Sequence, residues 1–372
     1  MPSLNPPARR AAHPPAAFRP LAELDAGDLE VLRLILRGDS VIDWRRLHFR
    51  TAAEVEHFLR LNLFELGDPR DERRLRSILA QAVEYLRSAY GYRVASPVAA
   101  PADLRDLFLV ASGHGEAARY RRIACVVLKC MHVLHHLEAR ELLFRTALRE
   151  ADLAERVDRR VMGVARQMAA DGYPIVEFHG NVKTRDSLVT KLLVKVDNVA
   201  AQVFDRVRYR VVVRTHDQIA PVLDHLCEVL FPFNYVLPGQ TLNTLLDFDE
   251  LLDAHPRGDE LAPALRPPAE PEDAGRRRAN PFSGKAYRAL NFVVDVPIRV
   301  DDLVAAEPPA GSEDLGRVVF SLVEFQVTDE ATARHNEQGA AAHARYKKRQ
   351  LKTALRRLSR GLVVPRRPRR EG

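Results

Sequence analysis

The hydrophobic pattern of the chain changes near Gly172, and this change limits most strongly which folds the chain can adopt. From Leu21 to about Asp171, apolar residues recur at helical spacing almost throughout. Beyond Gly172, β-branched runs of strand length alternate with helical segments. The sequence therefore predicts a disordered leader (1–20), a helical N-terminal region (21–171), an α+β domain (172–358) and a basic disordered tail (359–372).

Helix signals are clear in the N-terminal region. Asp25 and Asp28 place carboxylates where a helix begins, which suits its positive end. Thr51-Ala-Ala-Glu54 matches a capping box and precedes an apolar segment. The predicted helices begin at residue 25 and cover 55–63, 73–90, 117–148 and 151–170.

The second region mixes strands and helices along the chain. Its predicted strands cover 173–179, 204–214, 287–296 and 317–327, and its predicted helices cover 184–196, 215–231 and 330–358. A long, Pro-rich segment at about 236–282 is predicted to be a loop insertion with one short helix. This order predicts a mixed sheet of the α+β class, with helices on its faces.

Composition excludes several classes of protein. Hydrophobic residues make up 46% of the chain and charged residues 29%, as in ordinary globular proteins. We expect no membrane partner, because no stretch approaches the ~20 apolar residues of a spanning helix. The N-terminus lacks an apolar signal segment, and three cysteines do not make a disulfide framework. A cytoplasmic location is expected.

Two cysteines and three histidines gather in one apolar run. Cys125 and Cys130 are followed by His132, His135 and His136. Such residues can bind zinc, but zinc sites usually place cysteine pairs on tight loops, whereas this run has helical spacing. We therefore interpret it as a buried helix with small apolar thiols.

The chain carries a formal net charge of +7, which favours polyanionic partners. Part of the excess is arginine near the two ends, including Arg9, Arg10 and the run from Arg366 to Arg370. These basic segments are compatible with RNA contact. Solvated, disordered tails are the simpler interpretation.

Two carboxylates are candidate metal ligands because each interrupts an apolar strand. Asp205 begins the run from Phe204 to Val213, and Glu324 lies within the run from Val318 to Val327. A charge in a buried strand is costly unless it is paired or bound to a metal. Ion pairing is the alternative for each residue.

A segment upstream offers groups that bind phosphate. Lys183, Ser187 and Lys191 recur every four residues, so they share one face of a helix and begin near its N-terminus. Amide donors, a hydroxyl and two ammonium groups suit a triphosphate. The same spacing also occurs on ordinary solvated helices.

In chain order, these pieces resemble the synthetase domain of the RelA/SpoT family, and the resemblance implies a nucleotidyltransferase-like fold. The family's Gly-Arg-x-Lys segment corresponds to Gly180-Asn-Val-Lys183, and its Asp-x-x-x-x-Arg strand to Asp205 and Arg210. Its Gly-Tyr-x-x-Leu-His strand resembles Ala286 to Asn291, and its Glu-x-Gln-Ile-Arg-Thr segment resembles Glu324 to Asp329. The most specific match is an ungapped one at His335 to Lys347.

The resemblance implies transfer of pyrophosphate from ATP to a ribose 3′-hydroxyl, on GDP, GTP or the 3′ end of a tRNA. It implies that Asp205 and Glu324 are catalytic and hold Mg²⁺, and that Tyr287 stacks on guanine. The full set of implied substrate-binding residues is Lys183, Arg185, Ser187, Lys191, Arg210, Lys285, Tyr287, Asn291 and Gln326. Strand alternation places Gln326 on the same side as Glu324.

This chain departs from the family pattern at several substrate contacts. The Arg before the motif's Lys is Asn181, and Arg185 would take its place against adenine. The strand His is Asn291, which cannot carry a proton charge. Thr328 and Ala344 replace an Arg and a Trp. These changes concern the acceptor more than the fold.

Two functional interpretations follow. In the first, the chain is a divergent pyrophosphotransferase, because the carboxylate pair is kept. In the second, it is a non-catalytic relative that binds nucleotide or RNA, because substrate contacts are lost. No His-Asp dipeptide occurs in the N-terminal helical region (21–171), where long members of the family carry a hydrolase, so hydrolysis of the product is not expected. An oligomer is compatible with the sequence.

Overall fold

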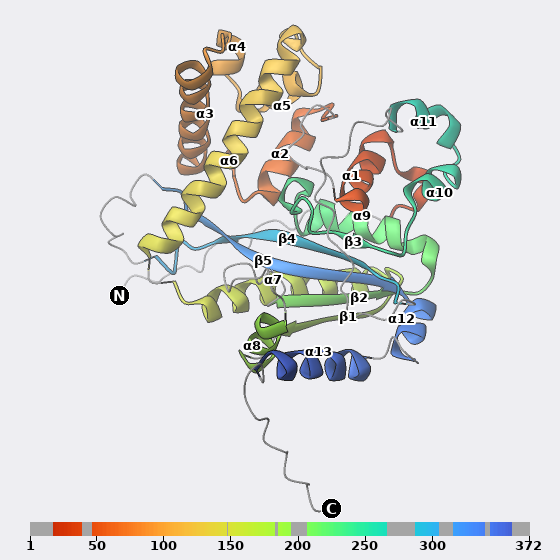
Figure 1. Cartoon of the computed structure of the whole chain (residues 1–372). Helices are drawn as coiled ribbons and strands as arrows, with labels where there is room; N and C mark the ends of the chain where they lie inside the picture. Colours follow the sequence, from red (N-terminus) through yellow and green to blue (C-terminus); the bar gives the residue numbers. More distant parts are fainter. Residues whose placement is uncertain are drawn as a thin grey trace, which may run out of the picture.

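The computed structural model describes eight stretches of the chain: residues 18–38, 47–146, 148–182, 185–194, 207–265, 287–304, 315–338 and 343–358. They form a sheet with helices around it and a layer of helices above it (Figure 1). The helices are α1 (Ala26–Arg37), α2 (Ala52–Leu61), α3 (Pro69–Tyr90), α4 (Ser96–Ala99), α5 (Leu104–Ala111), α6 (Arg121–Arg145), α7 (Glu150–Ala170), α8 (Arg185–Val194), α9 (Ile219–Val229), α10 (Phe248–Asp253), α11 (Gly258–Leu265), α12 (Glu330–Glu337) and α13 (His343–Leu358).

The sheet contains five strands in the order β1-β2-β5-β4-β3. They are β1 (Ile175–Val182), β2 (Val207–Val213), β3 (Leu242–Asn243), β4 (Leu290–Arg299) and β5 (Val318–Asp329). The β2–β5 pair is parallel, and the other three neighbouring pairs are antiparallel. This mixed sheet with flanking helices, preceded by helices, confirms the predicted α+β class.

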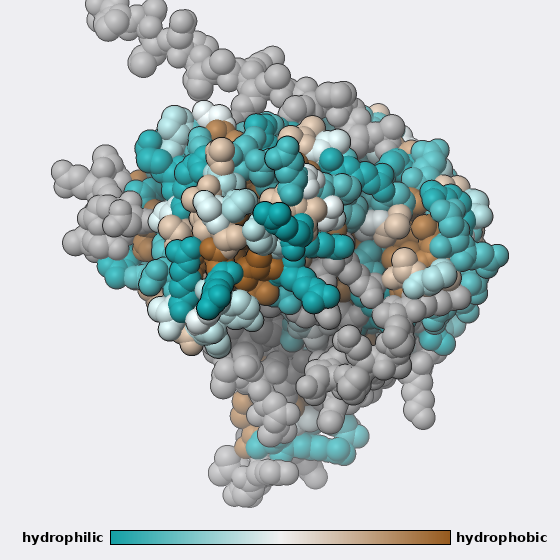
Figure 2. Space-filling view, turned by 90° about the horizontal axis from the view of Figure 1, so that it is seen from above, coloured by the Kyte–Doolittle hydropathy of each residue, from teal (hydrophilic) through white to brown (hydrophobic). Residues whose placement is uncertain are grey.

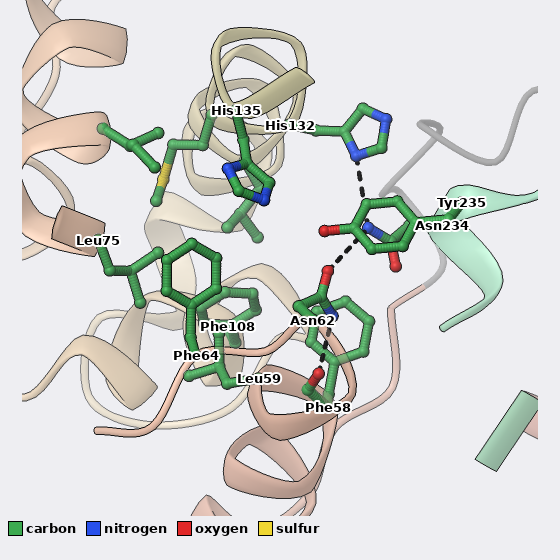
Figure 3. A pocket seen from close by; sticks show the side chains of 13 residues that line it. Phe58, Leu59, Asn62, Phe64, Leu75, Phe108, His132, His135, Asn234 and Tyr235 are labelled. Carbon is green, nitrogen blue, oxygen red and sulfur yellow. Dashed lines mark hydrogen bonds between the residues drawn. The ribbon is translucent and has the colours of Figure 1, made fainter. Parts of the chain in front are cut away.

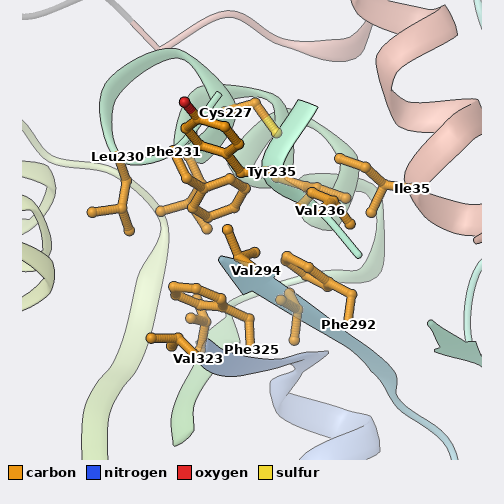
Figure 4. Close-up of a cluster of buried hydrophobic side chains, with 14 of the residues drawn as sticks. Ile35, Cys227, Leu230, Phe231, Tyr235, Val236, Phe292, Val294, Val323 and Phe325 are labelled. Carbon is orange, nitrogen blue, oxygen red and sulfur yellow. The ribbon is translucent and has the colours of Figure 1, made fainter. Parts of the chain in front are cut away.

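One face of the sheet is largely apolar and forms the larger core. Side chains alternate along a strand, so alternate apolar residues of β2, β4 and β5 point into this core. Aromatic rings stack at its centre, with the Phe292 and Phe325 centroids 5.6 Å apart and Phe231 5.2 Å from Phe325 (Figure 4). Helices α1, α7 and α9 cover this face.

A second, smaller core lies among the helices α2, α3, α5 and α6. It includes Val55, Ile78, Leu107 and Leu128, all of which are almost fully buried. The two cores divide the chain differently from the predicted boundary near residue 171. Helices α1 and α7, which the sequence assigns to the helical region, bury their apolar faces on the sheet.

The final predicted helix, 330–358, is divided in the structure into α12 and α13. The sequence does not predict the helices α4 and α5, and the described part of the insertion contains two short helices, α10 and α11, instead of one. The predicted leader also differs from the structure at its end. Phe18 packs edge-on against Tyr173, and Arg19 pairs with carboxylates of α1 and α9, so residues 18–20 are fixed.

The start of α1 shows how local sequence sets an element. The Asp25 side chain accepts hydrogen bonds from the backbone of Gly27 and Asp28, and the Asp28 carboxylate accepts one from the Asp25 backbone. This reciprocal capping box satisfies the backbone donors of the first turn. The helix ends at Gly38 with φ +69°, a left-handed conformation that glycine adopts without strain.

Among the described residues, no helix is long and apolar enough to cross a membrane. Figure 2 shows the molecule from above the helical layer, where hydrophilic side chains predominate and apolar ones come to the surface in patches.

Candidate functional site

The face of the sheet opposite the aromatic core carries polar side chains. Glu324 and Gln326 on β5 alternate with the core residue Phe325, so both point away from the core, as strand alternation predicts. Their register partners on the parallel strand β2 are Arg208 and Arg210. Four charged or polar side chains from two central strands therefore lie together.

Glu324 is the most buried charge on this face. Its side chain is 1% exposed, and its Oε2 accepts hydrogen bonds from Nε of Arg208 at 2.8 Å and from Nη2 at 2.6 Å. A carboxylate removed from water in this way needs such compensation. The predicted metal ligand is thus ion-paired in this structure, which is the alternative that the sequence left open.

Arg208 is a residue that sequence reasoning missed. The run Arg206-Val-Arg208-Tyr-Arg210 does contain its signal, because Arg208 and Arg210 share one face of the strand. Only the parallel register shows that Arg208, and not Arg210, is opposite Glu324.

Arg210 has other partners. Its guanidinium lies 3.1 Å from Oε1 of Glu337 on α12 and 3.5 Å from Oε2 of Glu177 on β1. Glu177 also lies 2.7 Å from Nδ1 of His179. Arg210 therefore links the start of β1, the sheet and α12.

Tyr287, Asn291 and Gln326 come together next to this pair. The amide of Gln326 donates a hydrogen bond to the hydroxyl of Tyr287, and Asn291 is the register partner of Gln326 on β4. Asn291 is buried, and its Oδ1 has no hydrogen-bond partner within the described stretches. A buried amide oxygen of this kind is a site where a ligand donor or a water molecule would bind.

The remaining predicted site residues are less well placed. Asp205, Lys183 and Lys285 lie outside the described residues. Arg185 and Lys191 belong to α8, but their side chains are outside the described set, whereas Ser187 on the same helix is exposed. Whether Asp205 approaches Glu324, and whether α8 forms a phosphate-binding face, remain predictions.

Carboxylate clusters with the spacing of a metal site occur elsewhere in the described part of the chain. Asp28, Asp224 and Glu228 form one, and Asp28 also lies with Asp25 and His48 in a second. In the first cluster, the guanidinium of Arg19 contacts all three carboxylates at 2.7–2.9 Å. The arginine thus supplies the positive charge that a cation would bring.

Burial raises the pKa of Asp224 to about 8, with further repulsion from Asp28 and with Arg19 acting in the opposite direction. Burial also raises the pKa of Glu228. Because three carboxylates share one guanidinium, we expect this cluster to retain a proton near neutral pH.

A cavity of about 50 Å³ lies between the helical layer and the turn after α9 (Figure 3). Its polar residues form a chain: Nδ2 of Asn234 donates to Oδ1 of Asn62 at 3.3 Å and lies 3.3 Å from Nδ1 of His132. Nε2 of His135 and Oδ1 of Asn234 are buried and without a hydrogen-bond partner among the described residues. Burial lowers the pKa of His135 to about 3 and that of His132 well below its usual value, so both rings are neutral.

The cavity lining is otherwise aromatic and aliphatic, and includes Phe58, Phe64, Leu75 and Phe108. A void of this size holds a few water molecules, which would satisfy the two unpartnered atoms. It offers no charged group for a phosphate, so we do not assign nucleotide chemistry to it. Cys125, from the predicted buried helix, lies in the core of this layer on α6.

No protein-family model and no curated protein matches the chain. Several solved structures are similar to the chain. Small alarmone synthetase 1 from Bacillus subtilis is 14% identical, with 61% of this chain and 89% of that chain covered and a TM-score of 0.29. A GTP pyrophosphokinase family protein from Streptococcus pneumoniae is 17% identical, with 60% and 88% covered and a TM-score of 0.28. Small alarmone synthetase 2 from Bacillus subtilis is 15% identical, with 57% and 95% covered and a TM-score of 0.27.

At such identities and TM-scores, the likeness does not establish an activity or a substrate. The function proposed below therefore depends on the residues of this chain.

Proposed function

We propose that this protein transfers the β,γ-pyrophosphate of ATP to a ribose 3′-hydroxyl. One observation carries the proposal: Tyr287, Asn291, Glu324 and Gln326, singled out by motifs in two separate segments, lie together on the polar face of the sheet. A chain selected only for a folded core has no need to gather these side chains opposite that core.

In the proposed reaction, the 3′-hydroxyl oxygen attacks the β-phosphorus of ATP. The bond between the β-phosphorus and the oxygen that bridges it to the α-phosphate breaks, AMP leaves, and the hydroxyl proton is lost. Such transfers depend mainly on positioning and on neutralisation of charge. Tyr287 presents a flat ring suited to a guanine base. Asn291 presents an Oδ1 that has no partner among the described residues and can accept a hydrogen bond from a ligand donor.

Mg²⁺ would neutralise the phosphate oxygens when bound. Its oxygen-rich coordination suits the carboxylates of Glu324 and Asp205, to which we assign it. Lys183, Ser187 and Lys191 are proposed to hold phosphates, with Arg185 against adenine. ATP is the donor, and a guanine nucleotide or a tRNA 3′ end is the acceptor. A cytoplasmic location is part of this proposal, because these substrates occur there.

A second function is favoured by a specific contact. Two hydrogen bonds from Arg208 already occupy one oxygen of Glu324. If this pair persists with nucleotide bound, Glu324 would be a structural anion, and the protein would bind nucleotide or RNA without turnover.

The two functions are separated by a transfer assay. Purified protein is incubated with γ-labelled ATP and Mg²⁺, together with GDP, GTP or bulk tRNA in turn. We expect label on one acceptor, with loss of transfer in Glu324→Gln and Asp205→Asn. Glu155→Gln is a matched control, because Glu155 is 71% exposed on α7, away from the polar face, and should keep activity.

If no acceptor is labelled, the pyrophosphotransferase proposal is wrong. ATP binding that persists without transfer, measured by calorimetry, would then support the non-catalytic function. A wild-type chain that neither transfers label nor binds nucleotide or RNA would exclude both functions.

A further inference from the structure

The helix α13 carries an unusual share of the charge of this chain. Its 16 residues, His343–Leu358, contain seven Lys and Arg and no Asp or Glu. The rest of the chain holds 50 Lys and Arg and 50 Asp and Glu. The whole net charge of +7 is therefore equal to the charge of this one helix.

The same helix exposes a stripe of leucines. Leu351 and Leu355 are each 51% exposed and Leu358 is 54% exposed. Their spacing of four and three residues places them on one side of the helix. Three large aliphatic side chains in a row at the surface mark a face that contacts something apolar.

A neighbouring side of α13 packs against α8, because Ala354 and Arg357 lie about 60° and 120° around the helix from Leu351, away from the basic residues. Ala354 is buried, and Nη1 of Arg357 donates a hydrogen bond to the carbonyl of Leu193 at 2.9 Å. In Figure 1 the two helices run side by side beneath the sheet. Partners can therefore reach α13 from one side only.

Helical geometry places the basic residues directly beside the leucines. At about 100° per residue, Lys348, Lys352 and Arg356 follow the leucine stripe around the helix. All three side chains are exposed. The accessible side of α13 thus has an apolar strip bordered by a cationic strip.

These features together select one kind of partner. A second copy of α13 would bring seven further positive charges against the first seven. RNA would neutralise the charges but leave the leucines in water. A protein groove that surrounds a helix would require α13 to leave α8.

A membrane surface with anionic lipids satisfies both strips of a helix that is open on one side. Basic helices with leucines on one face lie in the plane of such surfaces, with their apolar side among the acyl chains. Anionic headgroups attract each nearby Lys or Arg. This mode of binding needs no spanning helix.

We propose that α13 docks the protein peripherally on an anionic lipid surface through Leu351, Leu355 and Leu358 and the adjoining basic residues. This inference does not depend on the proposed enzymatic function. It concerns binding at a lipid surface, whereas the expectation from sequence of no membrane partner was drawn from the lack of a spanning segment.

Vesicle flotation of the full chain tests the proposal. Vesicles with about 30 mol % phosphatidylglycerol in phosphatidylcholine are compared with phosphatidylcholine alone. We expect at least about tenfold greater partition on the anionic vesicles, and at least about a tenfold loss in the double variant Leu351→Ser, Leu355→Ser. The triple variant Lys348→Gln, Lys352→Gln, Arg356→Gln should lose binding to a similar extent.

Matched controls use exposed residues of the same kind on other helices. Leu137→Ser with Phe144→Ser removes two exposed apolar side chains of α6, which are 58% and 78% exposed. Arg73→Gln, Arg122→Gln and Arg166→Gln together remove three exposed charges from α3, α6 and α7. Both controls should bind vesicles like the wild type.

Three outcomes would overturn the proposal. The first is failure of the wild-type chain to float with anionic vesicles at low salt. The second is binding that the leucine variant retains in full, which would indicate non-specific adsorption of charge. The third is a fall in oligomer mass in the leucine variant, by light scattering, without a change in vesicle binding, because the stripe would then join two copies. If circular dichroism shows that the leucine variant is unfolded, the basic variant decides.

Discussion

Replacing Arg208 by Gln is the most informative test of the polar face. The substitution removes two charge-assisted hydrogen bonds, of 2.6 and 2.8 Å, from a carboxylate that is 1% exposed. Breaking a fully buried pair costs about 3–5 kcal/mol. Because the Arg208 side chain is 32% exposed, we place the loss near the lower end, at about 3 kcal/mol.

A loss of this size lowers the melting temperature by roughly 4 °C in a protein of 372 residues, which differential scanning calorimetry resolves. Arg73→Gln, an exposed arginine on α3, is the control and should change stability by less than about 0.5 kcal/mol. If Arg208→Gln is no more destabilising than this control, the argument that Glu324 depends on Arg208 is refuted.

The same variant also tests the metal assignment. If Glu324 is a ligand of Mg²⁺, removing its competitor should strengthen binding of the ion. With about 10 mM Mg²⁺ and a dissociation constant of about 1 mM, the folded state would gain about 1.4 kcal/mol. We expect Mg²⁺ to raise the melting temperature of Arg208→Gln more than that of the wild type. An equal response in both proteins would argue against Glu324 as a metal ligand.

Three further predictions follow from other parts of the molecule. The pKa of Asp224 is raised to about 8 in the folded state, so its contribution to stability is present at low pH and is lost as pH rises from about 4 through 8. Asp224→Asn should therefore flatten this decline in the free energy of unfolding, measured with urea at pH 5 and pH 8. An unchanged decline in the variant would contradict the assignment. The pKa of His135 is lowered to about 3, so its contribution to stability is complete above about pH 6.5 and falls as pH drops towards 3. His135→Gln should reduce this acid sensitivity of the melting temperature, and an unchanged sensitivity would contradict the argument. Asp25→Ala removes the cap of α1 and should lower the free energy of unfolding by about 1–2 kcal/mol, whereas Asp25→Asn should lower it less. Equal shifts of the urea midpoint in the two variants would show that capping is not the cause.

Local pattern was sufficient to place most of the sheet. The runs around Val211, Val294 and Val323 are β-branched and apolar, and each became a central strand. Short helices gave too weak a signal: α4 has four residues and contains Pro97, and α5 has eight. At that length neither periodicity nor capping separates a helix from a turn.

Partners of an element were harder to predict than the element itself. The leucines of α1 form an apolar stripe, but a stripe does not show whether it packs on helices or on a sheet. The division into two cores therefore could not be read from the sequence. The contact of Arg208 with Glu324 likewise depends on the register between two strands whose residues are 116 positions apart.

The motifs did identify residues that meet in space. Tyr287, Asn291 and Gln326 were selected by resemblance, and the structure places them together. The order of the motifs along the chain is informative, because motifs that lie on neighbouring strands meet in the folded sheet. It does not show which residue pairs with Glu324, because the partner, Arg208, occupies a variable position of the Asp-x-x-x-x-Arg motif.

The position of α1 in the larger core has a consequence for synthesis of the protein. Its residues Leu29, Leu32 and Ile35 pack with α9, which follows about 190 residues later along the chain. At about 5–20 residues per second, the ribosome takes roughly 10–40 s to supply that partner. During this interval the helices α2 to α6 can complete their own core, while the apolar face of α1 stays uncovered. The nascent chain should therefore be most sensitive to chaperone depletion before α9 leaves the ribosome.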